Sequence, residues 1–79
     1  MAKRSVKLVF PQNLIKEPVV FTMAKKFDVV PNIRRARVTE TIGEMTLELE
    51  ASDEVLTRAI RYLEERGIKV QSALGESEI

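Results

Sequence analysis

The side chains able to take part in chemistry here are carboxylates, cationic groups, hydroxyls and amides, because the sequence contains no histidine and no cysteine. Their absence excludes the Ser–His and Cys–His pairs of nucleophilic catalysis, and no zinc site is expected. The adjacent carboxylates Glu64 and Glu65 fall on the exposed side of a predicted helix, which favours hydrated surface charges over a catalytic pair. Gly43, Gly67 and Gly75 are too scattered to form a phosphate-binding loop. The sequence therefore predicts a binding or regulatory module, not an enzyme, and no metal or cofactor.

The charge balance and the hydropathy pattern bear on whether the chain binds nucleic acid or inserts into a membrane. Thirteen basic and twelve acidic side chains give a formal net charge of +1. This balance argues against general nucleic-acid binding, which depends on concentrated positive charge. No apolar run approaches the ~20 residues that span a bilayer, and the N-terminus leads into an alternating pattern rather than a signal-peptide core. We expect a soluble, cytoplasmic protein that inserts into no membrane.

Hydrophobic periodicity predicts the elements that would position these groups. Period-two alternation predicts strands at residues 5–10, 32–39, 45–50 and 68–71, with a hairpin turn at 41–44. A first helix starts at Pro18, and its apolar stripe consists of Val20, Met23, Ala24 and Phe27. A second helix is capped by Ser52 and ends at Gly67. The order is βαββαβ, which is typical of an α+β, ferredoxin-like sandwich with strand order 4-1-3-2 and both helices on one face. The domain is predicted at residues 4–73, with tails at 1–3 and 74–79.

One face of the predicted sheet is left uncovered by the helices. Alternation in the second strand sets Ile33, Arg35, Arg37 and Thr39 on one side and Arg34, Ala36 and Val38 on the other. The uncovered face is expected to carry Lys7, Val9, Arg35, Arg37, Thr46, Glu48, Lys69 and Gln71. These charges either neutralise one another through cross-strand pairs or form a polar partner surface. An RNA-recognition sheet needs aromatic side chains on its two central strands; the corresponding residues here carry none, so RNA recognition is not expected.

Chain length adds an expectation about assembly. A chain of 79 residues buries a small core and has a thin stability margin. Disulfides and structural metals, which often help small scaffolds, are not available to it. A second subunit is the remaining common aid, so we expect a homodimer.

Residues 32–38, NIRRARV, resemble the signature of the NIL domain family, which is named for an Asn-Ile-Leu tripeptide at the start of its second strand. The resemblance covers nearly the whole chain: it includes Phe10-Pro11, Pro18, residues 27–29 and the closing segment 62–70. It implies regulatory ligand binding. NIL domains form the C-terminal part of the ATPase subunits of bacterial methionine importers, where a dimer of them binds methionine and restrains transport. Others are fused to ferredoxin modules with two iron–sulfur clusters.

The resemblance also implies ligand-binding residues. Asn32 corresponds to the motif asparagine of the methionine site, and its amide both donates and accepts hydrogen bonds; the alternative is ordinary strand-entry chemistry after Pro31. Ile33 would form an apolar wall for a thioether or part of an interface. Met45 would adjoin the site or pack in the core. Arg34 replaces the family leucine and would either extend its stem past the helices or pair with a ligand carboxylate.

Two hypotheses follow from the resemblance. The first is an amino-acid sensor, with a methionine-like ligand held at a homodimer interface near Asn32 and a transporter ATPase as partner. The second is a protein–protein adaptor that docks to a ferredoxin or sulfur-assimilation partner and binds no metabolite. The exposed strand around Arg35 and Arg37 motivates the second.

Overall fold

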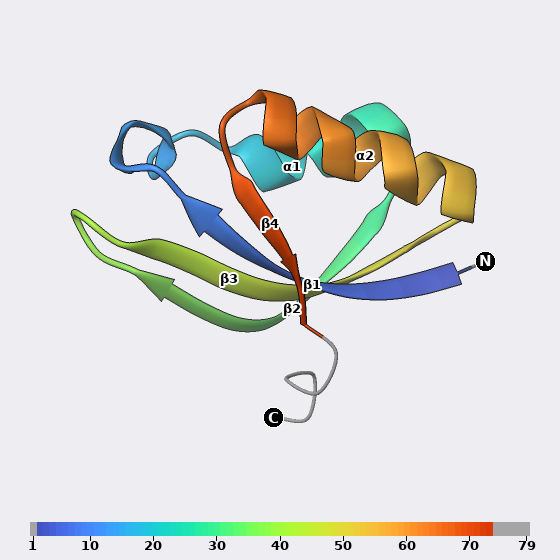
Figure 1. Cartoon of the computed structure of the whole chain (residues 1–79), viewed down its shortest axis with the longest axis horizontal. Helices are drawn as coiled ribbons and strands as arrows, with labels where there is room; N and C mark the ends of the chain where they lie inside the picture. Colours follow the sequence, from blue (N-terminus) through green and yellow to red (C-terminus); the bar gives the residue numbers. More distant parts are fainter. Residues whose placement is uncertain (1, 74–79) are drawn as a thin grey trace.

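The computed structural model describes residues 2–73, and its elements follow the predicted order. They are β1 (Ala2–Phe10), a 3-10 turn η1 (Gln12–Leu14), α1 (Val19–Phe27), β2 (Val30–Val38), β3 (Gly43–Ala51), α2 (Asp53–Glu65) and β4 (Lys69–Ser72). The strands form an antiparallel sheet in the order β2-β3-β1-β4. Read from the other edge, this is the predicted 4-1-3-2, so the ferredoxin-like sandwich is confirmed. Both helices lie on one side of the sheet (Figure 1).

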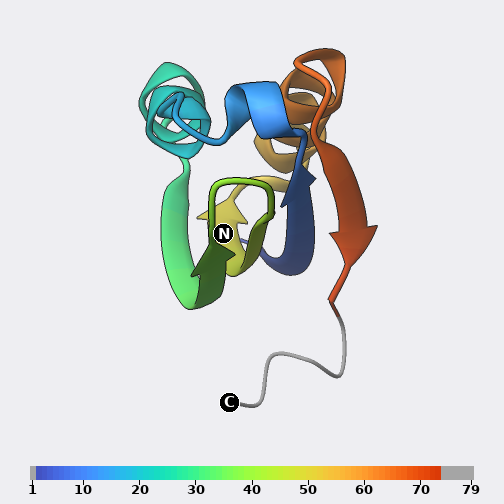
Figure 2. The same ribbon diagram turned by 90° about the vertical axis from the view of Figure 1, so that its left-hand side faces the viewer.

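The core lies between that side of the sheet and the two helices. Its largest fully buried side chains come from two strands and both helices: Leu8, Met23, Leu47, Leu49, Leu56 and Leu63. Burying each such side chain contributes roughly 1.5–3 kcal/mol. In Figure 2, α1 covers the β2 side of the sheet and α2 covers the β1 and β4 side. None of the helices within residues 2–73 is long and apolar enough to cross a membrane.

Local signals fix the ends of α2 as predicted. The Ser52 hydroxyl accepts a hydrogen bond from the Val55 N–H at 3.3 Å, and Asp53 lies in the first turn, where the helix dipole favours a negative charge. At the other end Gly67 has φ +98°, and the Ile68 N–H donates to the Leu63 carbonyl at 3.1 Å. This bond pattern is the glycine-terminated Schellman motif.

The first strand and the hairpin turn differ from the predicted bounds. β1 begins at Ala2, whereas residues 1–3 were predicted to form a tail. The predicted tail at 74–79 lies outside the described residues. The turn lies at residues 39–42, not 41–44, because Val38 already pairs with Gly43. Thr39 holds this turn: its N–H donates to the Ile42 carbonyl at 2.7 Å, and its hydroxyl accepts from the Ile42 N–H at 2.9 Å.

Residue 43 pairs with Phe10 and Val38 in the sheet, and the neighbouring side chains leave no room there for a residue larger than glycine. A β-carbon added there would lie 3.0 Å from the Phe10 β-carbon and 3.1 Å from an Ile15 side-chain carbon. The glycine therefore permits the end of β1 to pack closely on the start of β3.

A β-bulge in β2 overturns the predicted sides of two residues. Ile33 pairs with Leu47 but Arg35 pairs with Thr46, so Arg34 is the extra residue. Strict alternation was therefore wrong here: Ile33 shares the helix-facing side with Ala36 and Val38, and Arg34 extends over the open face to Glu48. The bulge causes this change because one inserted residue reverses the alternation of sides along a strand.

The register confirms the rest of the predicted open face. Lys7, Thr46 and Arg35 are direct cross-strand neighbours. Gln71 lies beyond Lys7, and Lys69 lies beside Val9. β2 forms one edge of this sheet, and every residue in it except Pro31 is exposed.

Candidate functional site

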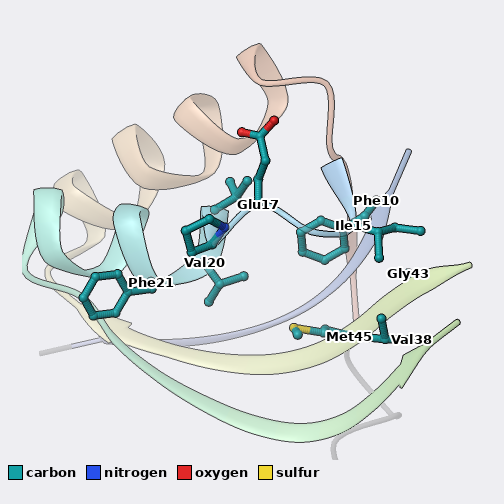
Figure 3. Close-up of a pocket in the computed structure, with 10 residues that line it drawn as sticks. Phe10, Ile15, Glu17, Val20, Phe21, Val38, Gly43 and Met45 are labelled. Atoms are coloured by element: carbon teal, nitrogen blue, oxygen red, sulfur yellow. The ribbon is translucent and has the colours of Figure 1, made fainter. Parts of the chain in front are cut away.

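An apolar groove opens between the start of α1 and the β2–β3 hairpin (Figure 3). Its volume is about 120 Å³. The lining is mostly hydrophobic and comes from β1, the connection before α1, α1 itself, β2 and β3: Phe10, Ile15, Glu17, Pro18, Val19, Val20, Phe21, Val38, Gly43 and Met45. A concave apolar site with few polar groups at its rim is typical of small-molecule binding.

The fold builds this groove from strand ends, the connection after β1 and the start of α1. Val38 and Met45 rise from the hairpin, and Val20 and Phe21 face them from α1 (Figure 3). The close approach at Gly43 draws Phe10 and Ile15 into the wall. Phe21 is 65% exposed, which is unusual for a large aromatic side chain and leaves the outer side of the groove uncovered.

The polar rim of the groove is anchored. The Glu17 carboxylate accepts a hydrogen bond from the Arg66 guanidinium at 2.9 Å. The Lys25 ammonium lies 5.9 Å from the centroid of the Phe21 ring, within the range of a cation–π contact. The Glu17 contact links the segment before α1 to the end of α2, whereas the Lys25 contact joins two residues within α1.

The structure separates the four predicted site residues. Met45 is half-buried and lines the groove. Ile33 is on the same, helix-facing side of the sheet but is 57% exposed. Asn32 lies on the opposite, open face, because it pairs with Glu48 of β3. Arg34 extends over the same open face, and within one chain these residues do not form a single site.

The two polar predicted residues are engaged with carboxylates. The Asn32 amide nitrogen donates to Glu50 Oε2 at 2.7 Å. The Arg34 guanidinium pairs with Glu48 Oε1 at 3.2 Å. Both contacts are exposed. An exposed ion pair such as Arg34–Glu48 contributes about 0–1 kcal/mol, so Arg34 can exchange its partner at small cost.

Most of the groove was not predicted from the sequence. Met45 was predicted as a site residue, but Phe10, Ile15, Phe21 and Val38 were not. One signal was present in the sequence. Phe21 lies outside the apolar stripe predicted for its helix, so core packing does not account for this large aromatic residue.

Comparison with known proteins shows the family to which the chain belongs. The NIL domain model matches residues 4–72. The chain belongs to the NIL domain family. A methionine import ATP-binding protein, MetN 2 of Acinetobacter baylyi, is 35% identical over 71 residues, which are 85% of this chain and 21% of that protein. MetN 1 of Bacillus cereus is 31% identical over 70 residues, which are 84% of this chain and 20% of that protein. This NIL domain thus spans about a fifth of the length of the relatives it matches.

A solved structure supports the fold of the NIL domain. The C-terminal domain of an ABC transporter ATP-binding protein from Enterococcus faecalis superposes with a TM-score of 0.79. The alignment covers 87% of this chain and 81% of that one, at 18% sequence identity. At this identity the likeness concerns the ferredoxin-like architecture alone.

Proposed function

We propose that this NIL domain is a regulatory module that binds methionine, or an amino acid with a similar side chain, at the interface of a homodimer. Its partner would be a transport ATPase. The family match and the names of the relatives support the class of ligand and partner. The apolar groove at Met45 is the observation that carries the proposal to this chain.

The groove suits a thioether side chain in size and chemistry. Its volume is about 120 Å³, and apolar cavities on the order of 150 Å³ admit a benzene-sized group. A methionine side chain has four heavy atoms beyond the α-carbon. Sulfur makes favourable contacts with aromatic rings, and Phe10 and Phe21 supply such rings in the lining.

The free edge of β2 offers the dimer contact. An unpaired edge strand presents a row of backbone donors and acceptors that a second strand can satisfy. Ile33 and Val38 are 57% and 55% exposed on the helix-facing side of this edge. A second copy of β2 running antiparallel to the first would bring its Asn32 end beside the Val38 end of its partner. Strand pairing keeps Asn32 of the second copy on the open face, so the ligand head group would reach it around the end of the paired strands, beside the Val38 end of the groove.

In that arrangement each residue has a distinct task. Ile33 of the second copy would close the exposed side of the groove. Asn32 would exchange its hydrogen bond with Glu50 for the ligand head group, whose ammonium and carboxylate match an amide that donates and accepts. Arg34 would bind the ligand carboxylate through its guanidinium in place of Glu48.

Calorimetric titration of the full chain with methionine tests the proposal. Saturable heat is expected from the wild type, with at least a tenfold weaker affinity for Asn32→Ala. Gln71→Ala is the matched control, because it removes an exposed amide from β4 at the opposite edge of the sheet. No heat and no thermal shift at millimolar methionine, norleucine or leucine would refute amino-acid sensing.

An adaptor that docks to a ferredoxin or sulfur-assimilation partner is the second candidate function. The exposed nine-residue edge strand with Arg35 and Arg37 favours it, because such an edge can accept a strand from another protein. Co-purification with an acidic partner at low salt, lost at high salt and unaffected by methionine, would support this function over sensing.

A further inference from the structure

The open face of the sheet contains a second concave site, away from the apolar groove. Thr46 lies at its centre and is 4% exposed, the sole buried polar residue among those described. Lys7 of β1 and Arg35 of β2 are its direct cross-strand neighbours. With Arg37, Glu44 and Met45 they line a cavity of about 160 Å³. We call Lys7, Arg35, Arg37 and Thr46 the cationic cradle.

Positive charge is concentrated on this face. The register places six basic residues there, Lys3, Lys7, Arg34, Arg35, Arg37 and Lys69, against three acidic ones, Glu44, Glu48 and Glu50. The surplus is three positive charges, although the whole chain carries a net charge of only +1. The small overall charge therefore conceals a strongly basic surface.

The cradle cations are not neutralised by the acidic residues around them. Arg34 pairs with Glu48, but within residues 2–73 no carboxylate oxygen lies within 4.0 Å of Lys7, Arg35 or Arg37. Lys7 and Arg35 flank Thr46 from the two strands on either side of β3, so the cations approach the same cavity from both sides. Of the charged residues that line the cavity, three are cationic and one, Glu44, is acidic, which leaves an excess of two positive charges.

We propose that the cationic cradle binds a doubly charged tetrahedral oxyanion, either phosphate or sulfate, free or as the terminal group of a metabolite. The guanidinium forks of Arg35 and Arg37 suit two oxygens each. The Lys7 ammonium supplies a point charge, and the Thr46 hydroxyl supplies a donor at the floor. A dianion matches the surplus of two charges. This site is independent of the homodimer, because strand pairing at β2 uses its outer backbone edge and leaves the open face uncovered.

Titration of the ¹⁵N-labelled full chain, followed by amide chemical shifts, tests the proposal. Sodium phosphate and sodium sulfate are added in separate series, with sodium chloride holding the ionic strength constant. Saturable shifts centred on Thr46 and Arg35 are expected. Arg35→Gln should weaken the affinity at least tenfold, whereas the control Arg61→Gln, which removes an exposed positive charge from α2, should leave it unchanged.

The two anion series also separate the sources of the ligand. Binding of both anions supports a site for tetrahedral dianions in general, and binding of one identifies the group. Shifts without saturation, or equal losses in Arg35→Gln and Arg61→Gln, would overturn the proposal in favour of diffuse counterion attraction. Acetate binding to the same amides with equal affinity would also overturn it, because a planar monoanion would then suffice.

Discussion

Met45 and Thr46 are consecutive residues of β3, yet they serve surfaces of opposite chemistry. Met45 lines the apolar groove beneath α1 and also borders the cavity of the cationic cradle, whereas Thr46 lines only that cavity, on the open face. The difference follows from the period-two alternation of a strand, which sends neighbouring side chains to opposite faces. A single central strand can therefore support two binding surfaces, but each depends on the register of its flanking strands.

In the flanking strand β2, the bulge determines which side chains lie on each face of the sheet. The extra residue at Arg34 sends Ile33 to the apolar side and leaves Arg34, Arg35 and Arg37 on the charged side. Without the bulge, one of these sets would lie on the wrong face. The bulge thus separates apolar from cationic side chains along a strand whose sequence mixes them.

The largest expected effect comes from truncating a core side chain of β3, the strand that contributes to both surfaces. Leu47 is fully buried and pairs with Val6 and Ile33. Leu47→Ala is expected to lower the free energy of unfolding by about 2–5 kcal/mol, through lost burial and the cavity left behind. Urea denaturation followed by circular dichroism measures this change. Ile42→Ala, at an exposed turn position, is the control, and equal losses in the two variants would contradict the assigned core.

A smaller effect is expected where the groove depends on close packing. Gly43→Ala introduces a β-carbon 3.0 Å from that of Phe10, a distance that forces backbone or side-chain movement. We expect a loss of about 1–3 kcal/mol from overpacking, together with weaker methionine binding and unchanged phosphate binding. Ala36→Val is the control, because it enlarges an exposed residue of β2. An unchanged unfolding midpoint for Gly43→Ala would contradict this prediction, because it would mean that Phe10 moves to accept the added methyl group without loss of stability.

The fold was predictable because its signals are local. The Ser52 cap, the Gly67 stop and the alternation in residues 45–50 each determine a feature within a few residues of themselves. The bulge was not predictable in the same way, since arginines at 34, 35 and 37 are compatible with either side of an exposed edge strand. The turn was misplaced for a related reason: what keeps Gly43 in the strand is its contact with Phe10, more than 30 residues earlier in the chain.

The candidate site was predicted only in part. The residues that were not predicted are distant in sequence and meet only through tertiary packing. Asn32, Ile33, Arg34 and Met45 came from a resemblance along the sequence, and only Met45 lines the groove. Phe10, Ile15 and Phe21 join it through the packing of β1, η1 and α1 on the hairpin, which no single segment specifies. Their side chains meet because the sheet order places β1 beside β3.

The smallest stability effect is expected at the bulge itself. Arg34→Leu restores the residue that gives the family its name, and it removes an exposed ion pair with Glu48. Such a pair contributes about 0–1 kcal/mol, so the unfolding free energy should change within that range.

Methionine binding by the Arg34→Leu variant separates the two roles proposed for the Arg34 side chain. A several-fold weaker affinity would indicate that the guanidinium binds the ligand carboxylate, whereas an unchanged affinity would restrict Arg34 to its pair with Glu48. Arg58→Leu, which removes the exposed α2 pair with Glu54, controls for the loss of an arginine ion pair, because it leaves both faces of the sheet intact.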